Sequence, residues 1–189
     1  MAHHTKNYTV LALDLSLSSS GYAVGIVEDG FLKVATFGHI DTKAYIKSGI
    51  GIRLNLIYDE ISRLIAEYKP DYVVKEQSFS RNAASTQKIF QVVGITILAA
   101  YQHGLEVADI GQSTVKKQIA GNGRATKEEV AERIRQLTGV STPVNDESDA
   151  LGILIAYCIQ NRGFHIGNIW NDETQRYFKT DTTPPEYFL

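Results

Sequence analysis

Apolar positions along the chain follow two periodicities, and together they predict an α/β domain. β-rich runs at 8–15, 21–30 and 31–40 are joined by short turns, which is typical of three antiparallel strands. Two later strands, at 71–77 and 105–111, are separated by a helical segment, which favours parallel pairing. We therefore expect an α/β fold with a mixed five-stranded sheet. Three antiparallel strands lead, parallel strands follow, and helices flank the sheet.

Helices are predicted where apolar residues recur every three or four positions. Ser or Thr caps and Gly stops mark the ends of several of them. The predicted helices cover 51–68, 85–101, 113–121, 126–139 and 146–159. Past Gly163 the chain becomes aromatic, polar and proline-bearing, so we expect one domain over 1–163 and a peripheral tail over 164–189.

Composition narrows the class of protein. A length of 189 residues suits a single hydrophobic core. The only cysteine, Cys158, excludes an internal disulfide and lies in an apolar helix, which indicates a reducing compartment. No apolar run reaches membrane-spanning length, and the N-terminus has no signal-peptide layout. We expect a cytoplasmic protein with no membrane partner.

Acidic residues stand at strand ends and at the start of the most apolar helix, "PVNDESDALGILIAYC". Asp14 ends the first strand and Glu76 ends the fourth. If these strands are parallel neighbours, both carboxylates emerge at one edge of the sheet. Asp146 and Asp149 are three residues apart at the helix start, so they share one helical face. We expect the four acids to meet in one pocket.

Each acid also has a purely structural interpretation. Asp14 can cap a hairpin loop, and Glu76 can be an ordinary strand-end charge. The helix acids can complement the helix dipole, where a cap contributes about 1 kcal/mol. Together, however, like charges a few ångströms apart repel by roughly 1–4 kcal/mol per pair. A pair of hard cations, Mg²⁺ or Mn²⁺, resolves that repulsion and suits an in-line displacement at phosphorus.

Three motifs carry a resemblance to a known family. They are "LALDLSLSSSGYAVGIV", "VVKEQSF" and "VNDESDALGILIAYC", in this order between Tyr8 and Cys158. They resemble the RuvC family of Holliday-junction resolvases, within the RNase H-like superfamily. The resemblance implies an RNase H-like nuclease domain over 1–163 that resolves four-way junctions by paired nicks with a two-metal hydrolytic mechanism. The implied ligands of two Mg²⁺ or Mn²⁺ ions are Asp14, Glu76, Asp146 and Asp149.

The same resemblance implies contacts with branched DNA. Phe79 matches a family aromatic that stacks at the opened junction, and Lys116 and Lys127 match two functional lysines, which we expect to be catalytic. Segment 114–139 carries six basic and three acidic side chains, so it can meet phosphates although the formal net charge is −2. The expected DNA-binding residues are Phe79, Arg81, Lys88, Lys116, Lys117, Arg124 and Lys127.

Paired nicks require two sites related by the twofold symmetry of the junction, so we expect a homodimer. The candidate interface is the helix 85–101. Its apolar stripe consists of Ile89, Val93, Ile97 and Ala100. The same stripe also suits a plain core helix.

The sequence departs from the family in its first motif. It reads Asp-Leu-Ser-Leu-Ser-Ser-Ser-Gly, where the family more often has Asp-Pro-Gly. Alternatives are a broader fork or flap nuclease, such as a phage or prophage member, a relative that acts on RNA, and a non-catalytic branched-DNA-binding protein. A kinase-type ATPase also holds phosphate with a Ser/Gly-rich hairpin, but it needs a second domain. We therefore expect no nucleotide cofactor, and a place in the bacterial cytoplasm or a phage-infected cell.

Overall fold

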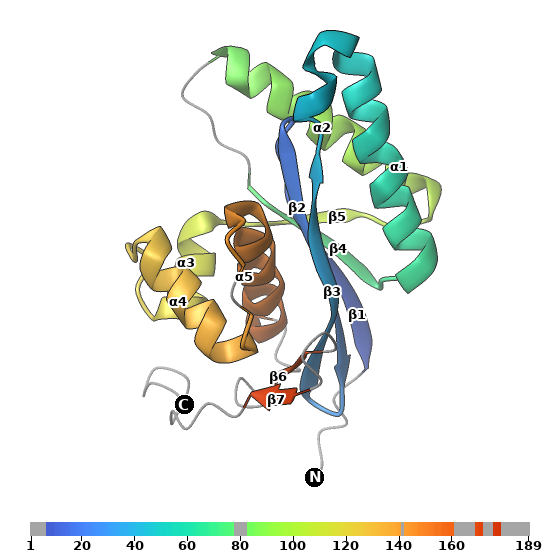
Figure 1. Cartoon of the computed structure of the whole chain (residues 1–189). Coiled ribbons are helices and arrows are strands. Elements are labelled where there is room, and N and C mark those ends of the chain that lie inside the picture. Colours follow the sequence, from blue (N-terminus) through green and yellow to red (C-terminus); the bar gives the residue numbers. More distant parts are fainter. Residues whose placement is uncertain (1–6, 78–82, 141, 161–168, 172–175, 179–189) are drawn as a thin grey trace.

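A computed structural model describes residues 7–77, 83–140, 142–160, 169–171 and 176–178. Its centre is one sheet, with helices on both faces (Figure 1). The strands are β1 (Tyr8–Asp14), β2 (Ser19–Glu28), β3 (Phe31–Asp41), β4 (Tyr72–Glu76), β5 (Val107–Ile110), β6 (Ile169–Asn171) and β7 (Arg176–Phe178). The helices are η1 (Lys43–Ser48, a 3-10 helix), α1 (Ile50–Tyr68), α2 (Ala83–Gln102), α3 (Gln112–Ala120), α4 (Lys127–Thr138) and α5 (Asn145–Gln160).

The predicted five-stranded mixed sheet is confirmed. β1, β2 and β3 pair antiparallel, while β4 joins β1 in parallel and β5 joins β4 in parallel. Leu13 pairs with Lys75 across β1 and β4. Asp14 and Glu76 are therefore the next residues at the same end of two neighbouring parallel strands, which is the arrangement that the sequence predicts for them.

Two features differ from the sequence prediction. β2 begins at Ser19, so the connection after Asp14 is only residues 15–18, and the last two serines belong to the strand. β6 and β7 continue the sheet beyond β3, in the order β5-β4-β1-β2-β3-β6-β7. β6 pairs in parallel with β3. These two short strands belong to the segment 164–189, which therefore contributes to the sheet.

The two faces of the sheet bury separate cores because side chains alternate along each strand. Val10 and Ala12 of β1 pack toward α5, and Leu11 and Leu13 pack toward α1 and α2. Helix α5 is buried continuously over 150–156, between the sheet and the pair α3 and α4 (Figure 1). Fully burying a Leu or Ile side chain contributes about 1.5–3 kcal/mol, so α5 is firmly fixed on the sheet.

Helix α2 turns a different side to solvent from the one that its sequence stripe indicates. Val93 is 8% exposed and Ala100 is fully buried, so these two residues belong to the core. The predicted interface stripe is wrong in these positions. The large apolar side chains of α2 that are exposed are Phe90, Ile97, Leu98 and Tyr101.

Among the described helices, none is long and apolar enough to cross a bilayer.

Helix α5 starts directly on top of β2 at Gly21. A Cβ atom on Gly21 would lie 1.9 Å from the backbone carbonyl oxygen of Asp146, a distance at which backbone must move. Gly21 pairs with Asp14 in the β1–β2 register. The glycine thereby lets the first turn of α5 approach the strand that stands beside the first acid.

Gly21→Ala should therefore destabilise the protein by at least about 1–3 kcal/mol, the usual cost of overpacking a close contact. The matched control is Gly51→Ala, because nothing lies within 4 Å of a Cβ at Gly51, which lies in helix α1. Alanine is a better helix former than glycine, so this control should be neutral or stabilising by up to about 1 kcal/mol. Urea unfolding measures both, and equal effects would contradict the close approach.

Candidate active site

One pocket gathers acids and lysines from β1, β4, α3, α4 and α5. It has a volume of about 170 Å³ and lies at the carboxyl ends of β1 and β4. Its charged lining residues are Asp14, Glu76, Lys116, Lys127, Asp146 and Asp149. Gln112, Val115, Val130 and Gly152 complete the lining. All six residues that the sequence analysis assigns to catalysis therefore line a single cavity.

The side chains of Asp14 and Glu76 point into the pocket because successive side chains along a strand alternate between its two faces. Asp14 lies on the same face of β1 as Val10 and Ala12, and Glu76 lies on the same face of β4 as Val74. Those apolar neighbours belong to the core beneath α5. Both carboxylates thus point to the side of the sheet on which α5 begins.

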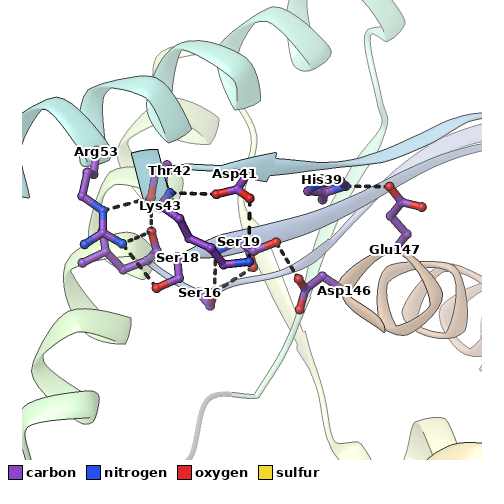
Figure 2. A network of polar contacts seen from close by, with 11 residues as sticks. Ser16, Ser18, Ser19, His39, Asp41, Thr42, Lys43, Arg53, Asp146 and Glu147 are labelled. Atoms are coloured by element: carbon purple, nitrogen blue, oxygen red, sulfur yellow. Dashed lines mark hydrogen bonds and ion pairs between the residues drawn. The ribbon is translucent and has the colours of Figure 1, made fainter. Parts of the chain in front are cut away.

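The helix acids have protein partners. The Ser19 hydroxyl donates a hydrogen bond to Oδ2 of Asp146 over 2.5 Å (Figure 2). The Lys127 ammonium donates to Oδ2 of Asp149 over 2.9 Å. Each of these carboxylates therefore has one oxygen engaged by a donor from another element of the fold.

The two lysines are held by local sequence signals. Lys127 is the first residue of α4, directly after the cap Thr126, which forms a reciprocal capping box with Glu129. Lys116 follows the buried Val115 in α3, a helix that ends at Gly121 in the left-handed conformation (φ 73°). The capping box at Thr126 fixes the start of the helix that carries Lys127, and both lysines line the pocket.

The carboxylates raise one another's affinity for protons. Burial, followed by the charges of Asp149, Glu76 and Asp146, raises the pKa of Asp14 from 3.8 to about 7, while Lys127 opposes the shift. Burial and the charge of Asp149 also raise the pKa of Glu76, and Lys127 and Lys116 oppose that shift. Negative charge in the pocket therefore exceeds what the two lysines balance.

The donor set suits hard divalent cations, which prefer carboxylate oxygens. After burial, the negative charges of neighbouring acids also raise the pKa of Asp14 and of Glu76, and these charges favour a cation in the pocket. Among the described residues, no three acidic, histidine or cysteine side chains already converge to form a metal site. In the structure, one oxygen of Asp146 accepts a hydrogen bond from Ser19 and one oxygen of Asp149 accepts one from Lys127, which leaves the second oxygen of each carboxylate for a cation.

The other predicted DNA-binding residues lie around and away from the pocket. Lys117 and Arg124 are exposed in and just after α3, near the pocket-lining Lys116. Lys88 is exposed on α2 and is not among the pocket-lining residues. Phe79 and Arg81 lie outside the described residues.

Sequence reasoning missed two polar residues that the fold brings to the acids. Gln112 lines the pocket at the start of α3, and Ser19 contacts Asp146. The sequence predicts strands at 8–15 and 21–30, which places Ser19 in the connection, whereas in the structure it is the first residue of β2. Ser19 stands two residues before Gly21, and residues two apart share one face of a strand. This spacing is the signal in the sequence that could have placed Ser19 on the same face as Gly21.

Comparison with known proteins gives consistent results. Residues 10–157 match the family model described as "Crossover junction endodeoxyribonuclease RuvC". A crossover junction endodeoxyribonuclease RuvC from Dictyoglomus thermophilum is 34% identical over 158 residues, covering 82% of this chain and 98% of that protein. One from Halorhodospira halophila is 35% identical, covering 78% and 88%.

Solved structures support the same fold. The Thermus thermophilus RuvC structure superposes with a TM-score of 0.72 at 24% identity, covering 82% of this chain and 96% of that one. Fold and acidic pocket define an RNase H-like nuclease. Because the family model spans most of the chain and relatives exceed 30% identity, the chain belongs to the RuvC family of crossover junction endodeoxyribonucleases.

The raised pKa of Asp14 predicts how stability depends on pH in the absence of metal. Between about pH 4 and pH 7 the folded protein retains a proton on Asp14 that the unfolded chain has released. The contribution of Asp14 to stability is therefore present at low pH and is lost as the pH rises toward 7. Asp14→Asn removes this contribution. The free energy of unfolding of this variant should therefore fall less than that of wild type over the same pH range.

Urea unfolding in EDTA at several pH values between 4 and 8 measures both proteins. Parallel stability curves for wild type and Asp14→Asn would contradict the mutual repulsion in the pocket.

Proposed function

We propose that this protein resolves four-way DNA junctions by paired nicks, using two Mg²⁺ or Mn²⁺ ions per active site. The observation that carries the proposal is a single pocket lined by four acids and two lysines. Membership of a crossover junction endodeoxyribonuclease family supports the reaction. T. thermophilus RuvC, which shares the fold, has been solved in complex with Holliday junction substrate, which supports the choice of DNA.

The four carboxylates would hold the ions. The charges of all three other acids act on Asp14, so Asp14 is the candidate to contact both ions. Glu76, Asp146 and Asp149 would supply the remaining carboxylate ligands. When bound, the ions would activate the attacking water and stabilise negative charge at the scissile phosphate. A structural set of helix caps offers no reason for four acids to share one cavity, which favours catalysis over a non-catalytic binder.

Lys127 would contribute a positive charge to the reaction. Its ammonium forms an ion pair with Asp149, and the negative charges of Asp14 and Glu76 also attract it. Lys127 has a side chain that is 63% exposed, so its ammonium would be able to leave Asp149 if bound ions neutralised these acids. It would then counter the charge that develops on the phosphate, and Lys116 would assist from α3.

The DNA would cross the basic surface beside the pocket. Lys117 and Arg124 are exposed there and supply phosphate contacts, which carry most of the affinity for DNA at moderate salt. By resemblance to the family, Phe79 stacks at the opened junction. Arg81 and Lys88 extend the same footprint, with residues 1–163 as the nuclease unit and 164–189 as a peripheral extension. We place this activity in the bacterial cytoplasm.

A homodimer would supply the two active sites. The exposed apolar face of α2 is the candidate interface, because Phe90, Ile97, Leu98 and Tyr101 are 58%, 49%, 49% and 76% exposed. These residues recur at intervals of seven, one and three, so they share one side of the helix. Exposed apolar patches of this kind mark interaction surfaces.

Asp14→Asn and Glu76→Gln should bind four-way junctions but cut them at least about 100-fold more slowly, since each loses a metal ligand. Binding should persist because it rests on phosphate contacts from other residues. The measurement pairs gel-shift affinity with single-turnover cleavage in Mg²⁺ and in Mn²⁺. Glu106→Gln, an exposed glutamate next to β5, is the matched control and should cut normally. Wild-type rates in both site variants would disprove the assignment.

A parallel substrate panel of four-way, three-way, flap and linear DNA, with a matched RNA junction, decides the substrate class. The proposal expects fastest cleavage of four-way DNA. Equal rates on flaps would indicate a broader branched-DNA nuclease.

Leu98→Glu should convert the dimer to monomers, because a buried charge at the interface has no partner. Analytical ultracentrifugation measures the mass, and a supercoiled cruciform substrate reports whether the two nicks remain paired. Phe31→Glu is the control, since Phe31 is 42% exposed on β3 and should leave the mass unchanged. A wild-type protein that is already monomeric at micromolar concentration would rule out this interface.

A further inference from the structure

The first turn of α5 is held on the sheet at three points, and Figure 2 shows the two that are made by side chains. Ser19 Oγ in β2 donates to Asp146 Oδ2 over 2.5 Å. His39 Nδ1 in β3 lies 2.6 Å from Glu147 Oε1. Between these side-chain contacts, Gly21 allows the backbone of Asp146 to rest on β2.

The three points belong to one face of the sheet. Ser19 and Gly21 are two residues apart in β2, so both face α5. Gly21 pairs with Asp14 on one side and with His39 on the other. The contacts that hold Asp146 and Glu147 therefore lie on the part of the sheet that pairs with Asp14.

Ser19 is itself rigidly placed. It is 5% exposed, and its backbone N–H donates to Ser16 Oγ over 3.0 Å. The connection 15–18 is fixed in turn by Arg53, whose Nη2 donates to the Leu17 carbonyl oxygen over 3.0 Å. Arg53 is buried, and its nitrogen atoms donate to neutral oxygens in this network (Figure 2). The Ser19 hydroxyl is thus presented from a connection that is held by hydrogen bonds to a buried arginine.

The contact of His39 is similarly supported. Glu147 has a side chain that is only 14% exposed, and its second oxygen accepts a hydrogen bond from Thr142. Glu147 therefore bridges β3 and the segment that enters α5. This bridge opposes rotation of the helix start about its own axis, a rotation that would move Asp146 and Asp149 together.

We propose that Ser19 and His39 are positioning residues of the nuclease site. Ser19 engages one oxygen of the Asp146 carboxylate and fixes its orientation, and His39 fixes the helix turn through Glu147. The inference rests on the proposed function, in which Asp146 and Asp149 bind divalent ions. Partners of metal-binding carboxylates commonly contribute 10–100-fold to metal affinity or activity.

Ser19→Ala tests the first contact, with Ser20→Ala as the matched control. Ser20 is the next residue of β2 and is fully buried, but its hydroxyl donates to the Ser16 carbonyl oxygen and not to an acid. Calorimetric titration of the full-length protein with Mn²⁺ alone should show an affinity about 10–100-fold weaker in Ser19→Ala. Ser20→Ala should retain the wild-type affinity, and Ser19→Thr, which keeps the hydroxyl, should restore much of the loss.

Cleavage assays add a second readout. The Mn²⁺ concentration for half-maximal cleavage should rise in Ser19→Ala, while the Kd for the junction in EDTA stays unchanged. His39→Val should weaken Mn²⁺ binding in the same direction, and His39→Gln, which keeps a donor, should preserve it.

Three outcomes overturn the inference and leave the proposed function intact. Equal Mn²⁺ affinities in Ser19→Ala and wild type show that the contact is only structural. Tighter binding in Ser19→Ala shows that Ser19 competes with the ion. A further loss on adding Ser19→Ala to Asp146→Asn shows that Ser19 acts through another group. If wild type itself binds no Mn²⁺, the proposed function fails as well, which separates the two failures.

Discussion

Four carboxylates that share one pocket repel one another, and apolar burial elsewhere in the chain supplies the free energy that keeps them together. Two of them are mounted at the ends of β1 and β4, and two at the start of a helix that is buried on nearly every side. Because α5 is fixed by its core residues, its first turn cannot retreat from Asp14. Burial, together with this repulsion, raises the pKa of Asp14 and of Glu76.

Part of the site is already ordered by contacts within the protein. Ser19 and Lys127 already engage Asp146 and Asp149, and the capping box at Thr126 fixes the helix end that carries Lys127. The fold thus offers partial compensation of charge without removing it. Because Ser19 and Lys127 restrict the carboxylates of Asp146 and Asp149, less ordering of these two side chains remains when a ligand binds.

Much of this arrangement could be predicted from sequence. The alternation of apolar residues gave the strand order of the leading hairpins, and the spacing of Asp146 and Asp149 gave their common face. The bounds of β2 were less predictable, because a run of serines satisfies a turn and a strand equally well. The apolar residues of α2 also recur all round the helix, so the pattern could not separate Val93, which is buried, from Leu98, which is exposed. That choice depends on where α1 packs, a tertiary property.

The sheet ends on both sides in short strands, β5 with four residues and β7 with three. A long strand at an edge exposes unpaired backbone groups that attract another chain, whereas short edges give an incoming strand little to pair with. The long strand β3 has its outer side partly covered by β6. The terminal edges at β5 and β7 therefore offer another copy of the chain few backbone groups for joining two sheets into one.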